Sequence, residues 1–165
     1  KLQKNKISYL YLDKTYQKVL ESKNNTLVLI SVLEHLREPH KILNFFRKSK
    51  IKYLYISVPL FSLSALIENS FKSIFPRHLA GNHTHLYTKE SLYFLAKKYK
   101  LKIIGEWWFG QDFPDLYRSL INSSTGNIKK YKPLMDKYLF SHIDELQNVL
   151  DKNKMCSQVH MIFKK

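Results

Sequence analysis

The stretch from Asn25 to Pro39 constrains the fold most. Residues 26–31, Thr-Leu-Val-Leu-Ile-Ser, form a short and nearly continuous run of β-branched and aliphatic side chains. Such a run is typical of a strand that is buried on both faces, as in parallel sheets. Glu34 and His35 follow at once, and Pro39 suits the first position of a helix, where its missing N–H costs nothing. The stretch therefore predicts a strand, a polar turn and a helix in an α/β fold.

A strand that ends in acidic and imidazole side chains is typical of a ligand crevice. In open α/β sheets such crevices lie outside the carboxyl ends of the parallel strands. The alternative is a buried strand whose next turn carries Glu34 and His35 by chance. Spacing alone leaves both interpretations open.

Three motifs resemble class I S-adenosylmethionine (SAM)-dependent methyltransferases. Residues 32–36, Val-Leu-Glu-His-Leu, followed by Pro39 are similar to the segment after the fourth strand of that family. Residues 55–59, Tyr-Ile-Ser-Val-Pro, are similar to the fifth strand with its terminal proline. Residues 83–109 are similar to the helix and strand that come next. The motifs follow the family's order over residues 25–109.

The resemblance implies a partial Rossmann-like methyltransferase fold, with a mostly parallel sheet and an antiparallel last strand. It implies SAM as cofactor, with Glu34 at the methionine end, Ser31 beside it and Asp13 near the adenine. His35 is the candidate general base, because an imidazole titrates near neutral pH. The alternatives are that Glu34 stabilises the N-terminus of the next helix, and that His35 is a core histidine.

Periodicity and turn residues predict the other elements. Strands are expected at residues 7–12, 51–58, 101–109 and 158–163, and helices at 15–22, 62–74, 88–99, 112–121 and 133–150, besides the helix that Pro39 begins. The segment 60–88 resembles an insertion that forms part of a substrate lid. The alternative is a helix there that only packs on the sheet.

His83, His85 and Trp108 are the candidate substrate-binding residues. The two histidines alternate in His-x-His, which puts both rings on one face of an extended segment and, with His78, would suit a metal. No cysteine or acidic residue lies nearby in the sequence, so no metal site is predicted. For Trp108 the alternative is core packing.

Composition narrows the classes of partner. The net charge is +15, but only four of the 28 basic residues are arginines, namely Arg37, Arg47, Arg77 and Arg118. Nucleic-acid binders favour clustered arginine, so a nucleic-acid partner is not expected. No apolar run approaches the ~20 residues of a membrane helix. The single Cys156 cannot form an internal disulfide, which favours a reducing, cytoplasmic location.

Glycine is unusually sparse for the fold that the motifs suggest. The four glycines are Gly81, Gly105, Gly110 and Gly126, and no Gly-x-Gly turn occurs. The family's cofactor-cradling first motif is therefore not found, and the chain opens on Lys1. We expect residues 1–165 to form a single domain, the C-terminal part of a methyltransferase domain.

Two functional hypotheses follow. In the first, the parent protein transfers a methyl group from SAM to a small-molecule or glycan-type acceptor. In the second, a non-catalytic remnant of the fold serves as a basic binding or interaction module. Under either hypothesis residues 26–31 become a sheet edge without charge or proline. We expect residues 7–12, a second copy in a homo-oligomer, or further residues to cover that edge.

Overall fold

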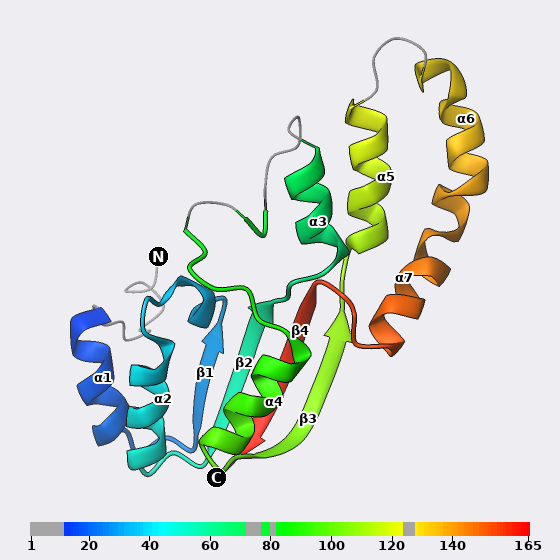
Figure 1. Ribbon diagram of the computed structural model, residues 1–165. Helices are drawn as coiled ribbons and strands as arrows, with labels where there is room; N and C mark the ends of the chain where they lie inside the picture. Colours follow the sequence, from blue (N-terminus) through cyan, green and yellow to red (C-terminus); the bar gives the residue numbers. More distant parts are fainter. Residues whose placement is uncertain (1–11, 72–76, 80–81, 124–127) are drawn as a thin grey trace, which may run out of the picture.

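The computed structural model describes residues 12–71, 77–79, 82–123 and 128–165 (Figure 1). Helices and strands alternate through most of the described chain, which confirms the α/β class. In chain order the elements are α1 (Leu12–Glu21), β1 (Thr26–Ile30), η1 (Leu33–His35), α2 (Pro39–Lys48), β2 (Tyr53–Pro59), α3 (Leu63–Ser70), α4 (Lys89–Lys98), β3 (Lys102–Phe109), α5 (Asp112–Ser123), α6 (Ile128–Tyr138), η2 (Phe140–His142), α7 (Ile143–Lys152) and β4 (Gln158–Lys164).

The four strands of the described chain form one sheet in the order β1-β2-β4-β3. β1 and β2 are parallel, with Thr26 opposite Tyr53 and Ile30 opposite Ser57. β4 runs antiparallel to both of its neighbours, β2 and β3. Three strands therefore point one way and the last strand points the other way, as predicted. The carboxyl ends of β1 and β2 lie side by side at one edge of the sheet (Figure 1).

One face of the sheet carries the hydrophobic core. α2 and α4 lie over this face, and α1 packs against α2 at its outer side (Figure 1). Ile42, Leu43 and Phe46 form the buried stripe of α2. Each such side chain contributes about 1.5–3 kcal/mol by leaving water. Packing against Ile56 and its neighbours in the core cluster thus holds the short helix in place.

No described element covers the opposite face of the sheet. Val28 and Ile30 of β1 are 53% and 56% exposed, and Trp107 of β3 is 62% exposed. The prediction that residues 26–31 are buried on both faces is therefore wrong for the described chain, in which β1 is an edge strand with one open face. The prediction that another segment or a second copy covers it stays a prediction.

Local sequence signals place the helix starts correctly in two cases. Pro39 is the first residue of α2. Thr88 caps α4: its hydroxyl accepts a hydrogen bond from the Ser91 N–H at 3.1 Å, and the Ser91 hydroxyl accepts one from the Thr88 N–H at 2.8 Å. These two bonds satisfy N–H groups that an uncapped helix leaves free.

The helical C-terminal third differs from the prediction. Instead of one helix over 133–150, α6 begins at Ile128 and the short helix η2 separates it from α7. Pro133 lies inside α6 rather than at its start. Pro133 lacks the N–H that would donate one hydrogen bond within α6, and the helix continues past this missing bond. At the other end of the chain, the strand expected at 7–12 lies outside the described residues except Leu12, which begins α1.

Candidate active site

A strained turn ends strand β1 and opens the site. The Ser31 N–H donates to the Ser57 carbonyl at 3.0 Å, which continues the pairing of β1 with β2. Ser31 has φ 50°, in the left-handed region that side chains other than glycine rarely adopt. The chain then reverses into η1, which carries Glu34 and His35. Such backbone strain is common at functional sites.

Glu34 is the buried centre of this turn. The residue is only 1% exposed, and among the described residues its carboxylate oxygen Oε2 has no hydrogen-bond partner. Its backbone carbonyl accepts hydrogen bonds from the N–H of Thr84 at 2.7 Å and from the Thr84 hydroxyl at 3.0 Å. These bonds tie the segment around His83 to η1, although about 50 residues separate them in the sequence. A buried carboxylate oxygen without a donor is costly unless a ligand supplies one.

Two imidazoles flank Glu34. The rings of His35 and His83 meet edge to face with centroids 4.7 Å apart. His35 Nδ1 lies 2.9 Å from the Asn82 carbonyl, and His83 Nδ1 lies 2.9 Å from the His78 carbonyl. A carbonyl oxygen only accepts, so both Nδ1 atoms must carry the proton that makes the bond. We call Glu34, His35 and His83 the Glu34 cluster.

A cavity of about 200 Å³ opens beside this cluster. It is lined by Ser31, Glu34, Pro59, Arg77, His78, His83 and Gln158. Tyr87 lies behind Glu34, buried, with its hydroxyl donating to the Leu33 carbonyl at 3.4 Å. Burial and the negative charge of Glu34 raise the pKa of Tyr87 to about 12, so its phenol stays protonated at neutral pH.

The structure brings together some predicted site residues and separates others. Ser31, Glu34, His35 and His83 meet at the carboxyl ends of β1 and β2. His85 points its Nδ1 toward the Thr84 hydroxyl, at 2.9 Å, and stacks on Tyr87, so it lies outside the Glu34 cluster.

Two further candidates lie elsewhere. Trp108 packs in the hydrophobic core from β3, which two strands, β2 and β4, separate from β1. Asp13 is in the first turn of α1 and not at a strand end.

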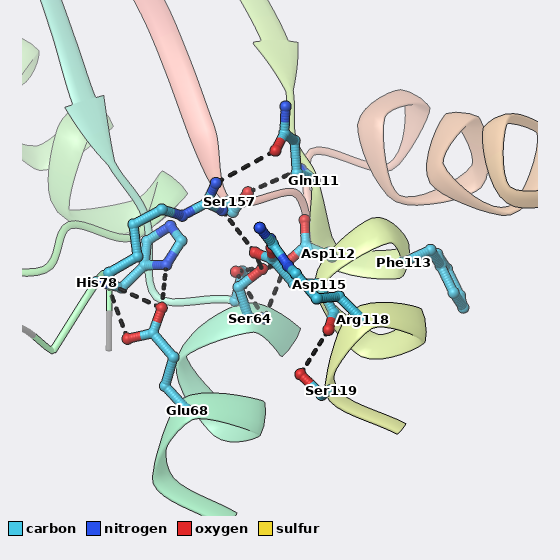
Figure 2. Close-up of polar contacts among 12 residues, drawn as sticks. Ser64, Glu68, His78, Gln111, Asp112, Phe113, Asp115, Arg118, Ser119 and Ser157 are labelled. Atoms are coloured by element: carbon cyan, nitrogen blue, oxygen red, sulfur yellow. Dashed lines mark hydrogen bonds and ion pairs between the residues drawn. The ribbon is translucent and has the colours of Figure 1, made fainter. Parts of the chain in front are cut away.

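A second polar cluster, which sequence reasoning missed, lies among α3, α5 and α7 (Figure 2). Asp112 is fully buried, and its Oδ1 accepts from the hydroxyl groups of Ser62 and Ser64, at 2.6 and 2.9 Å, and from the Ser64 N–H at 2.9 Å. Its Oδ2 accepts from Gln147 Nε2 at 3.3 Å. Asp115 is next to it and accepts from Ser64, Arg77 and Arg118. We call Ser62, Ser64, Asp112, Asp115 and Gln147 the serine–aspartate cluster.

Close approach of the backbone explains one glycine beside this second cluster. A Cβ on Gly110 would lie 2.5 Å from Asp112 Oδ2 and 2.7 Å from the Ser157 nitrogen. Gly110 therefore allows the chain to pass directly from β3 into α5. Asp112 is the first residue of α5, and its carboxylate lies at the N-terminus of α3, where it accepts from the Ser64 N–H. The Ser62 cap and the N–H groups there favour a negative charge.

A hydrogen-bonded contact between His78 and Glu68 links the segment that precedes His83 to α3. His78 is buried and its Nδ1 lies 2.8 Å from Glu68 Oε1 (Figure 2). Burial alone would raise the pKa of Glu68, but the N–H groups of Leu79 and His78 outweigh it and hold that pKa below its usual value. Glu68 therefore fixes His78, whose carbonyl in turn orients His83.

No family model matches the chain, and no curated protein matches it. Among solved structures it is similar to a SAM-dependent methyltransferase from Archaeoglobus fulgidus, at 16% identity and TM-score 0.52, over 96% of this chain and 67% of that one. The chain has a methyltransferase-like fold.

Other solved structures resemble this methyltransferase-like chain more loosely. The methyltransferase domain of bacterial CtHen1-CN matches at 16% identity and TM-score 0.45, over 100% of this chain and 65% of that one. Coclaurine N-methyltransferase, bound to N-methylheliamine and S-adenosylhomocysteine, matches at 16% identity and TM-score 0.40, over 85% and 48%. The chain thus spans about two thirds of the first two proteins and about half of the third. In the described residues no helix is long and apolar enough to cross a membrane.

Proposed function

We propose that the protein transfers a methyl group from SAM to a small-molecule or glycan-type acceptor. The observation that supports this most directly is the Glu34 cluster at the carboxyl ends of two parallel strands. In an α/β sheet this is where ligands bind. The fold is compatible with many functions, so the proposal depends on the residues of the site rather than on the sheet.

The cavity beside Glu34 suits the amino-acid end of SAM. Its lining includes one carboxylate, Glu34, and one guanidinium, Arg77, which complement an ammonium and a carboxylate group. The Oε2 atom of Glu34 has no donor of its own, and an ammonium group would supply one. When bound, the cofactor supplies an electrophilic methyl group on a sulfonium. We keep Ser31 as a residue of this cofactor site, because it lines the same cavity.

The chain's own residues would position the acceptor and take up its proton. His35 is exposed and donates through Nδ1 to the Asn82 carbonyl, which leaves Nε2 as an acceptor. An acceptor hydroxyl or amine held next to Nε2 would give up its proton as the methyl bond forms. Holding both reactants in line removes most of the entropic cost of the bimolecular reaction.

We also propose that the segment 60–88 closes over this site. Its described parts are anchored at three points: Glu68 holds His78, Arg77 pairs with Asp115 at 2.5 Å, and Thr84 bonds to η1. The anchors connect the cavity lining to both α3 and α5. Such a connection would couple acceptor binding in the cavity to the positions of α3 and α5.

Cofactor binding is tested with S-adenosylhomocysteine titrated into the full-length protein in a calorimeter. We expect Glu34→Gln to weaken binding by about tenfold or more, because a charge-assisted bond is lost. Glu38→Gln is the matched control, since Glu38 is exposed and pairs with Lys41. A folded protein that binds neither SAM nor S-adenosylhomocysteine would contradict the proposal and favour the non-catalytic binding module.

The role of His35 is tested by turnover. Once an acceptor has been found, His35→Ala should lower kcat by about 10²–10⁴ while cofactor affinity changes little. Unchanged kcat together with a lower melting temperature would assign His35 to structure instead.

A further inference from the structure

We infer that Glu34, His35 and His83 bind a divalent transition-metal ion such as Zn²⁺. One ligand atom from each of the three lies within 4.8 Å of the other two. Ligand atoms around a tetrahedral Zn²⁺, at ~2.0–2.2 Å from the ion, are ~3.3 Å apart. Small side-chain rotations would therefore bring the three atoms onto one ion.

The hydrogen bonds of the two histidines select the nitrogen that would bind the ion. Each ring donates its Nδ1–H to a backbone carbonyl, that of Asn82 for His35 and that of His78 for His83. This leaves a lone pair on each Nε2, and no described residue hydrogen-bonds to either Nε2. A metal-ligating histidine almost always donates its other ring N–H in this way, which fixes the ring and raises its basicity.

Without a cation the cluster consists of acceptors alone. The Glu34 carboxylate and the two Nε2 lone pairs all carry negative potential, and among the described residues no ion pair or hydrogen bond joins Glu34 to either ring. Glu34 is 1% exposed and its Oε2 has no partner among the described residues, so water reaches little of this carboxylate. A cation placed between the three atoms would remove this cost.

The donor set narrows the type of ion. Two imidazole nitrogens and one carboxylate oxygen suit Zn²⁺, Co²⁺ or another first-row ion, whereas Mg²⁺ and Ca²⁺ prefer oxygen ligands. Three protein ligands leave coordination positions for water or for a substrate atom, as in catalytic rather than structural sites.

The nearby charges permit a cation in this place. Arg77 lines the adjoining cavity, but its guanidinium pairs with Asp115 at 2.5 Å and bonds Gln111 at 3.2 Å. The guanidinium is thus directed to Asp115, which also pairs with Arg118, and among the described residues no ion pair joins it to Glu34. His78 directs its Nδ1 to Glu68.

The inference goes beyond methyl transfer and does not depend on it. An ion on the cluster would replace the roles proposed above for Glu34 and His35. An acceptor oxygen bound to the ion would become more acidic, so that it could lose its proton without a histidine base. Metal binding itself can be measured without any acceptor or cofactor.

The test is a Zn²⁺ titration of the metal-free full-length protein, followed by calorimetry and by thermal unfolding. We expect one ion per chain with a Kd of about 10 μM or below, and a rise in Tm of about 5–10 °C at saturation. Glu34→Gln, His35→Ala and His83→Ala should each weaken binding about 100-fold. His85→Ala is the matched control, since His85 lies outside the cluster, and its affinity should stay within about threefold of the wild type.

Cobalt provides a second readout that does not depend on stability. Co²⁺ at the site should give the intense visible absorption of a low-coordinate nitrogen and oxygen environment, and Glu34→Gln, which preserves side-chain shape, should abolish it. No Zn²⁺ binding below about 1 mM, or binding that Glu34→Gln and His83→Ala leave unchanged, would overturn the inference.

Discussion

The molecule contains two polar clusters, each with a buried carboxylate, and the two carboxylates differ in the hydrogen bonds that they accept. In the serine–aspartate cluster the fully buried Asp112 carboxylate accepts four hydrogen bonds, three on Oδ1 and one on Oδ2. In the Glu34 cluster an equally buried carboxylate keeps one oxygen without a donor, beside two imidazoles whose free nitrogens are acceptors. The first cluster is internally satisfied, whereas the second is not.

We interpret this difference as that between a structural role for Asp112 and the functional role proposed above for Glu34. A buried carboxylate surrounded by donors joins three helices and needs nothing further. A buried carboxylate that lacks a donor is retained only where something else, a ligand or an ion, provides the missing interaction. Burial and charge alone would not distinguish Asp112 from Glu34; the hydrogen-bond partners do.

The largest expected effect is in the satisfied cluster. Asp112→Ala removes the acceptor of the Ser62 hydroxyl. It also removes one of two acceptors of the Ser64 hydroxyl, the Ser64 N–H and the Gln147 amide, which keep Asp115, Ser62 and Asp151. The loss should cost about 2–3 kcal/mol of unfolding free energy. Asp112→Asn keeps one carbonyl oxygen and should cost less. Urea denaturation measures both variants. If Asp112→Ala lowers the unfolding free energy by less than about 1 kcal/mol, this cluster does not stabilise the fold as proposed.

Glu34→Gln should have a smaller effect, and of the opposite sign. The substitution replaces an unpaired buried charge with a neutral amide, so in metal-free, ligand-free protein we expect the unfolding free energy to stay equal or to rise by up to about 1 kcal/mol. The same urea titration, with a chelator present, measures it. A loss greater than about 1 kcal/mol would show that Glu34 is held by the fold as Asp112 is, and the contrast between the clusters would fail.

Sequence reasoning identified those parts of the fold that depend on local patterns. The apolar run at 26–31, Pro39 and Thr88 each carry a short-range signal, and β1, α2 and α4 begin as predicted. The division of the C-terminal helix is not local in this sense. Nothing in the sequence near Leu139 separates a continuous helix from α6 followed by η2 and α7.

The site was predictable only in part, because its members come from distant segments. Glu34 and His35 were predicted from a contiguous motif. A metal site was not expected, because no acidic residue lies near His83 in the sequence; the fold supplies Glu34 from 49 positions earlier through the Thr84 bonds. The serine–aspartate cluster was missed for the same reason, since Ser64 and Asp112 meet only through the packing of α3 on α5.

The smallest expected effect is the pH dependence of stability at a third histidine, His160. His160 lies on the uncovered face of the sheet, where its Nδ1 shares a hydrogen bond with the Tyr55 hydroxyl and its ring meets Trp107 and Phe109 edge to face. Unlike the carbonyls that face His35 and His83, this hydroxyl can donate as well as accept. Burial lowers the pKa of His160 below its usual 6.5, so the folded protein favours the neutral ring.

Between the lowered pKa of His160 in the folded protein and its usual value of 6.5, the unfolded chain binds more protons than the folded one. The contribution of His160 is thus fully present above about pH 6.5 and is lost as the pH falls toward the lower, folded-state pKa. Because the ring is partly exposed, we expect the wild type to lose less than about 1 kcal/mol more than His160→Gln between about pH 7.5 and 5.5. Gln keeps an acceptor for Tyr55 but does not titrate, which makes it the matched variant. Urea denaturation at both pH values measures the difference. Equal losses in the two proteins would mean that His160 titrates normally and that the open face of the sheet does not desolvate it.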